Sequence, residues 1–82
     1  MNKEQLSEWL RAYLSNLVDL PVKEIEDDVD FDSYGLDSLM SVGLLSDLSE
    51  SVGFDLEPAM IYHYPNIRNL TERVAYLIQF RE

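Results

Sequence analysis

The chain has no cysteine, and this absence excludes several kinds of chemistry at once. A disulfide framework, a thiolate metal site and a cysteine nucleophile all need that side chain. Glycine and proline are scarce as well, with three residues of each. Disordered segments are poor in apolar residues, whereas 46% of this chain is hydrophobic. The composition therefore predicts a folded globular domain.

Long apolar segments are also missing. No hydrophobic run approaches the roughly 20 residues of a membrane-spanning helix. The first residues, Met1-Asn2-Lys3-Glu4, lack the apolar stretch of a secretion signal. We therefore expect a cytoplasmic protein with no membrane partner. A chain of 82 residues predicts a single domain, 1–82, with few residues to spare for an active site of its own.

Basic residues are the third scarcity. Sixteen Asp and Glu against six Lys and Arg give a formal charge of −10, and no Lys or Arg lies between Lys23 and Arg68. This acidic field repels nucleic acid and attracts basic protein surfaces, although such charge can also serve solubility alone. We expect no nucleic-acid partner. The eleven carboxylates in the interval are Glu24, Glu26, Asp27, Asp28, Asp30, Asp32, Asp37, Asp47, Glu50, Asp55 and Glu57.

Hydrophobic spacing predicts an all-α fold of four helices with a long loop between the first two. Asn2 and Gln5 have the form of a capping box at the start of the first helix, and Pro21 should end that helix. Its apolar positions recur at helical spacing at Leu6, Trp9, Leu10, Tyr13, Leu14 and Leu17. The loop over 22–37 should be anchored to the core by Ile25, Val29, Phe31 and Leu36.

The second helix is expected from Ser38 to Val52, with Gly53 in the left-handed turn that follows it. Its core face carries Leu44, Leu45, Leu48 and Val52, with Val42 at the margin. The opposite face holds two large apolar residues beside carboxylates, as a partner-docking patch does. The alternative is that Leu39 lies under the preceding loop and Met40 is a scattered surface residue. The predicted docking residues are Leu39, Met40, Asp47 and Glu50.

A short third helix should begin at Pro58 and run through Tyr62, with Pro65 preventing its continuation. Its residues Met60, Ile61, Tyr62 and Tyr64 could line a channel or contact a partner, but such residues are more often core. Asn66 can cap the last helix. The apolar stripe of that helix is Ile67, Leu70, Val74, Leu77 and Ile78, while Arg68, Glu72, Arg73 and Gln79 should face water.

Ser38 stands at the start of the second helix, where a phosphate ester would be favoured. A helix start leaves backbone N–H groups unpaired and carries the positive end of the helix dipole. Gly35 allows the chain to turn sharply before it. Taken alone, however, a serine here is better explained as a helix cap.

Two runs of residues resemble the acyl carrier proteins: Gly35-Leu36-Asp37-Ser38-Leu39-Met40 and Ile61-Tyr62-His63-Tyr64-Pro65-Asn66-Ile67. The resemblance covers nearly the whole chain and is strongest to carrier domains of modular polyketide synthases. It implies a four-helix bundle of acyl-carrier type, with a 4′-phosphopantetheine arm from coenzyme A on Ser38. It also implies that Asp37 helps a phosphopantetheinyl transferase and its magnesium ion engage the serine.

Such a carrier holds acyl or polyketide intermediates as thioesters and performs no catalysis. The implied partners of a monomeric carrier are the transferase, acyltransferase, ketosynthase and other synthase enzymes with basic docking surfaces. Gly43 departs from the family pattern, because related carriers often have a glutamate there. The alternatives are a peptidyl or fatty-acid carrier of another pathway, and an acidic four-helix interaction module without the arm.

Two other kinds of site have weaker support. A serine nucleophile needs a nearby base, and nothing in the spacing orients the single histidine, His63, toward Ser38. The run 28–32 has alternating carboxylates like an EF-hand calcium loop. However, Ser33 and Leu39 occupy the positions of its turn glycine and bidentate glutamate. The sequence therefore predicts neither a catalytic residue nor a dedicated metal site.

Overall fold

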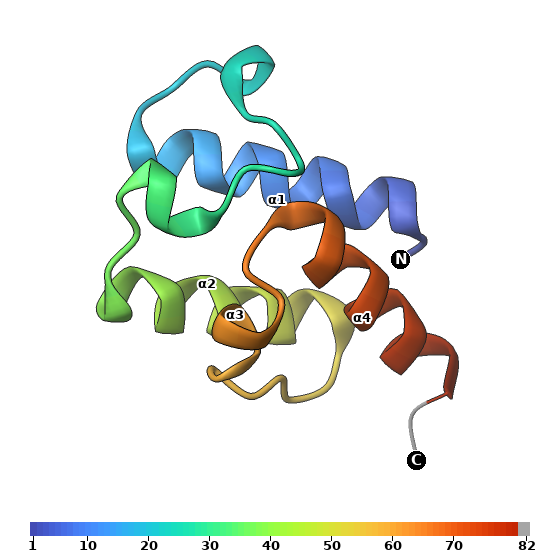
Figure 1. Cartoon of the computed structure of the whole chain (residues 1–82). Coiled ribbons are helices and arrows are strands. Elements are labelled where there is room, and N and C mark those ends of the chain that lie inside the picture. Colours follow the sequence, from blue (N-terminus) through green and yellow to red (C-terminus); the bar gives the residue numbers. More distant parts are fainter. Residues whose placement is uncertain (81–82) are drawn as a thin grey trace.

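The computed structural model describes residues 1–80, which form four α-helices and two short 3₁₀ turns (Figure 1). This arrangement confirms the expected all-α fold with a long first loop and a short third helix. Within the described residues no helix is both long and apolar enough to span a membrane. The elements in order are α1 (Lys3–Val18), η1 (Val22–Glu24), η2 (Phe31–Tyr34), α2 (Ser38–Val52), α3 (Met60–His63) and α4 (Ile67–Phe80).

Helix α1 begins as its sequence predicts. Asn2 Oδ1 accepts a hydrogen bond from the backbone N–H of Gln5 at 2.8 Å, and Gln5 Oε1 accepts one from the N–H of Asn2 at 3.0 Å. This reciprocal pair is the expected capping box. The helix ends at Val18, and the capping residue Asp19 adopts the left-handed conformation with a φ of 58° just before Leu20 and Pro21.

The three long helices meet in a leucine-rich core. Leucines of α1 and α2 and the apolar stripe of α4 belong to one cluster, in which nine side chains are completely buried. Burial of this kind is the main favourable contribution to folding. The completely buried residues are Leu6, Leu10, Leu14, Leu44, Leu45, Leu48, Ile67, Leu70 and Val74.

The first loop is fastened to both α1 and α4. The Arg11 guanidinium donates to both carboxylate oxygens of Asp27 at 2.7 Å, while the backbone carbonyl of Asp27 accepts from the N–H of Arg68 at 2.9 Å. The N–H of Phe31 donates to the carbonyl of Pro65 at 2.8 Å. These bonds fix the loop that leads to α2. The predicted anchors Ile25, Phe31 and Leu36 are buried, and Val29 is half-buried.

Two expectations for the C-terminal half need correction. Helix α3 starts at Met60 and not at Pro58, because a turn precedes it in which the N–H of Met60 bonds to Glu57 O at 3.0 Å. Arg73 does not simply face water: it is half-buried, with its guanidinium carbon 5.2 Å from the centre of the Tyr76 ring. The predicted cap of α4 is present, since Asn66 Oδ1 accepts from the N–H of Asn69 at 2.9 Å.

Candidate functional site

The start of α2 is capped by Asp37 and not by Ser38. Asp37 Oδ1 accepts a hydrogen bond from the backbone N–H of Met40 at 2.8 Å, and its own backbone is extended. Gly35, with a φ of 85°, turns the chain out of η2 toward this cap. The capping role considered for Ser38 is thus filled by its neighbour, so that Ser38 is the first helical residue.

The Ser38 side chain is exposed and faces α3. Its Oγ lies 3.5 Å from the hydroxyl of Tyr62, a long hydrogen bond in which either group can donate. Both residues line one hollow of about 300 Å³ between the first loop and α3. The other residues around this hollow are Phe31, Asp32, Leu36, Asp37, Ser41, Ile61 and Pro65.

The core interpretation is wrong for one of the aromatic residues of the third helix. Ile61 is buried as expected, and Met60 and Tyr64 are half-buried, but 67% of Tyr62 is exposed. A helix of four residues can turn only part of its surface inward, so the residue after Ile61 points out. Sequence reasoning missed the proximity of Tyr62 to Ser38, because 24 residues separate them and only the packing of α3 brings them together.

His63 is exposed and pairs with its neighbour instead of with Ser38. Its ring lies edge-on to that of Tyr64, with ring centres 6.4 Å apart. The group beside the Ser38 hydroxyl is the phenol of Tyr62. A serine nucleophile requires a base within hydrogen-bond reach, and a phenol is not the histidine that usually serves as that base.

The four predicted docking residues differ in accessibility. Leu39 is 81% exposed next to Ser38, so it does not lie under the preceding loop. Asp47 and Glu50 are exposed farther along α2. Met40 is half-buried and packs against the core, which leaves it at the edge of this surface. We call Leu39, Met40, Asp47 and Glu50 the α2 surface.

A family model described as "phosphopantetheine attachment site" matches residues 8–74, most of the chain. The chain belongs to this family. Its members are carrier domains to which phosphopantetheine is attached covalently. The family resemblance and the carrier role read from the sequence are thereby confirmed.

Individual relatives agree with this carrier identity. The acyl carrier protein TtuC of Teredinibacter turnerae is 32% identical over 88% of this chain and 83% of its own length. A phenolphthiocerol/phthiocerol polyketide synthase protein of Mycobacterium tuberculosis is 27% identical over 89% of this chain, which spans only 4% of that protein. A free-standing peptidyl carrier protein from Acinetobacter baumannii superposes with a TM-score of 0.89 at 29% identity, covering 95% of this chain and 98% of that one.

The carrier domain has one contact on the α2 surface that its sequence did not indicate. The Tyr13 hydroxyl of α1 donates a hydrogen bond to Asp47 Oδ2 at 2.6 Å. Burial, followed by this bond and the charge of Asp47, raises the pKa of Tyr13 to about 12. The spacing of Tyr13 predicts a core-facing residue, and its half-buried ring does pack against the core. Its hydroxyl bond to Asp47 is the part that the spacing does not predict.

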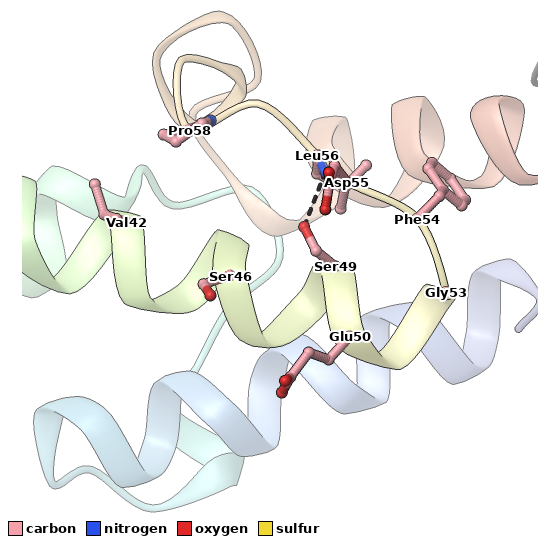
Figure 2. A pocket seen from close by; sticks show the side chains of 9 residues that line it. All are labelled: Val42, Ser46, Ser49, Glu50, Gly53, Phe54, Asp55, Leu56 and Pro58. Carbon is pink, nitrogen blue, oxygen red and sulfur yellow. Dashed lines mark hydrogen bonds between the residues drawn. The ribbon is translucent and has the colours of Figure 1, made fainter.

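A second hollow of the carrier domain lies between α2 and the α2–α3 loop (Figure 2). It is open and has a volume of about 540 Å³. Ser49 holds the loop against the helix here, because its Oγ accepts from the N–H of Leu56 at 2.9 Å (Figure 2). The same Oγ donates to the carbonyl of Leu45 at 2.8 Å. The lining is Val42, Ser46, Ser49, Glu50, Gly53, Phe54, Asp55, Leu56 and Pro58.

Proposed function

We propose that Ser38 carries the 4′-phosphopantetheine arm of this domain. The observation behind this proposal is the division of roles at the start of α2. Asp37 takes the capping bond, which leaves the exposed Ser38 hydroxyl with only its long contact to Tyr62 among the hydrogen bonds of residues 1–80. The phosphate suits this position because the positive end of the helix dipole favours an anion.

Attachment is a phosphoryl transfer between Ser38 and coenzyme A. Ser38 Oγ attacks the phosphorus that bears the pantetheine; the new O–P bond forms as the bond to adenosine 3′,5′-bisphosphate breaks, and the serine proton passes to a base of the transferase. Asp37 Oδ1 is engaged by Met40. We propose that the Asp37 carboxylate also contacts the magnesium ion that the phosphopantetheinyl transferase brings.

Once attached, the arm supplies a terminal thiol that holds an acyl group as a thioester. The domain itself contributes tethering, which keeps the cargo at high effective concentration near successive enzymes. In our proposal the domain, 1–82, is monomeric, cytoplasmic and non-catalytic. Its partners, besides the transferase, are acyltransferase, ketosynthase and other enzymes of a polyketide synthase, in keeping with the relative that is named a polyketide synthase.

We further propose that these enzymes dock on the α2 surface. Leu39 offers an exposed apolar contact beside the arm, and Asp47 and Glu50 supply negative charge for basic partners. A peptidyl carrier is the second candidate, favoured by the structural likeness to the peptidyl carrier protein of Acinetobacter baumannii.

Mapping of the modified residue tests the assignment to Ser38. The protein is loaded from coenzyme A by a broad-specificity phosphopantetheinyl transferase, digested, and sequenced by tandem mass spectrometry. We expect the arm on Ser38 and not on the nearby serines, since Ser33 lies in η2 and Ser41 is buried. An arm on either of those residues would overturn the assignment.

A further inference from the structure

We propose that the Tyr62 hydroxyl donates a hydrogen bond to the phosphate of the arm, so that Tyr62 positions the base of the arm against α3. This inference rests on the proposed attachment at Ser38. It assigns a ligand to the hydroxyl of a tyrosine that is 67% exposed beside Ser38.

Distance supports a contact that strengthens on modification. In the unmodified protein the two hydroxyl oxygens of Ser38 and Tyr62 are 3.5 Å apart, which is long for a bond between hydroxyls. A phosphate ester on Oγ bonds the phosphorus to the serine oxygen and places its anionic oxygens one bond farther out, where the Tyr62 hydroxyl can donate to them. Hydrogen bonds to an anionic oxygen are shorter and stronger than those between neutral groups.

The electrostatic surroundings make a neutral donor valuable here. Asp32 and Asp37 line the hollow that Ser38 and Tyr62 share, and no Lys or Arg occurs between residues 23 and 68. A phosphate on Ser38 therefore enters negative surroundings. The N–H of Met40, which could otherwise bind an anion at the helix start, already donates to Asp37.

Three arginines of other elements lie elsewhere, and one of them, Arg68, lines a separate hollow with Lys3 and Asp27. Arg11 is paired with Asp27, and Arg73 lies over the rings of Tyr64 and Tyr76. The backbone of Tyr62 is fixed by its own N–H, which donates to the carbonyl of Ala59 at 3.0 Å. A positioned phenol is thus the side-chain donor that the fold presents to this phosphate.

The test compares loaded wild type with loaded Tyr62→Phe, which keeps the ring and removes only the hydroxyl. Tyr76→Phe is the matched control, because Tyr76 is also exposed but lies on α4 against Phe80. The readouts are the ³¹P chemical shift of the phosphodiester and the nuclear Overhauser effects between the ring of residue 62 and the two methyl groups of the arm's pantoyl unit.

We expect Tyr62→Phe to move the ³¹P resonance and to weaken these Overhauser effects by at least half. A hydrogen bond of ordinary net strength changes populations about fivefold. The control should leave both unchanged. Identical spectra for Tyr62→Phe and wild type, with Ser38 fully loaded by mass, would overturn the inference and leave the carrier role intact. Failure of Ser38 to load would overturn both, and the intact mass shows which case holds.

Discussion

Tyr13 on α1 is joined to Asp47 on α2 by a hydrogen bond of 2.6 Å, which ties the first helix to the α2 surface. The phenol lies near Gly43, since a Cβ added at that glycine would be 3.9 Å from the Tyr13 oxygen. Asp47 therefore has a bonding partner within the fold while remaining exposed to solvent. The same carboxylate can stabilise the domain and meet an enzyme.

Removal of this bond should cost stability. Tyr13→Phe deletes the hydroxyl but keeps the ring, which stacks on Trp9 with ring centres 5.0 Å apart. We expect the free energy of unfolding in urea to fall by about 0.5–1.5 kcal/mol. Tyr76→Phe, which removes another exposed hydroxyl, should change it by less than about 0.5 kcal/mol. Equal effects of the two substitutions would show that the Tyr13 bond contributes nothing.

The same pair predicts a dependence of stability on alkaline pH. Burial, together with Asp47, raises the pKa of Tyr13 to about 12, above the ordinary value of 10.0. The folded state therefore favours the protonated phenol, and its contribution to stability is complete below pH 10 and lost between about pH 10 and 12. Urea unfolding should show the advantage of wild type over Tyr13→Phe shrinking across that window. An advantage that stays constant to pH 12 would contradict the raised pKa.

Gly43 is expected to weaken α2. It lies in the helix interior at an ordinary φ, and an added Cβ would meet the Tyr13 hydroxyl only at van der Waals distance. Gly43→Ala should therefore raise the free energy of unfolding by about 1 kcal/mol. Gly53→Ala is the opposing control, because Gly53 has a φ of 87° and should lose stability on substitution. Loss of stability in Gly43→Ala would mean that the Tyr13 contact does not tolerate a methyl group.

Charge reversal on the α2 surface should separate docking from modification. Asp47→Lys and Glu50→Lys should each raise the KM of a partner synthase enzyme for the carrier, most clearly at low salt. Loading of Ser38 should be normal in both variants. Asp47→Lys should also lose the stability of the Tyr13 bond, whereas Glu50→Lys should not. Glu72→Lys, an exposed reversal on α4, is the control. Normal partner turnover by both α2 variants would contradict the docking proposal.

Local signals explain how much of this fold could be predicted from the sequence. The capping box at Asn2, the left-handed Gly53 and the cap at Asn66 each depend on residues within a few positions, and all three are present. The start of α3 is not fixed by such a local signal. Pro58 suits the first position of a helix, but it suits the separate turn before Met60 equally well.

The site was only partly predictable for a different reason. Asp37 and Ser38 both suit a helix start, and sequence alone could not say which one caps it. The pairs Ser38–Tyr62 and Tyr13–Asp47 join residues 24 and 34 positions apart. No local pattern records such pairs, because they depend on how the helices pack.

The central claim is that Ser38 accepts the arm, and intact mass tests it most directly. Wild type and Ser38→Ala are incubated with coenzyme A, magnesium and a broad-specificity phosphopantetheinyl transferase, after circular dichroism has shown that both are folded. The account predicts a gain of one phosphopantetheine in wild type and none in Ser38→Ala. No gain in folded wild type, or an equal gain in the variant, would contradict it.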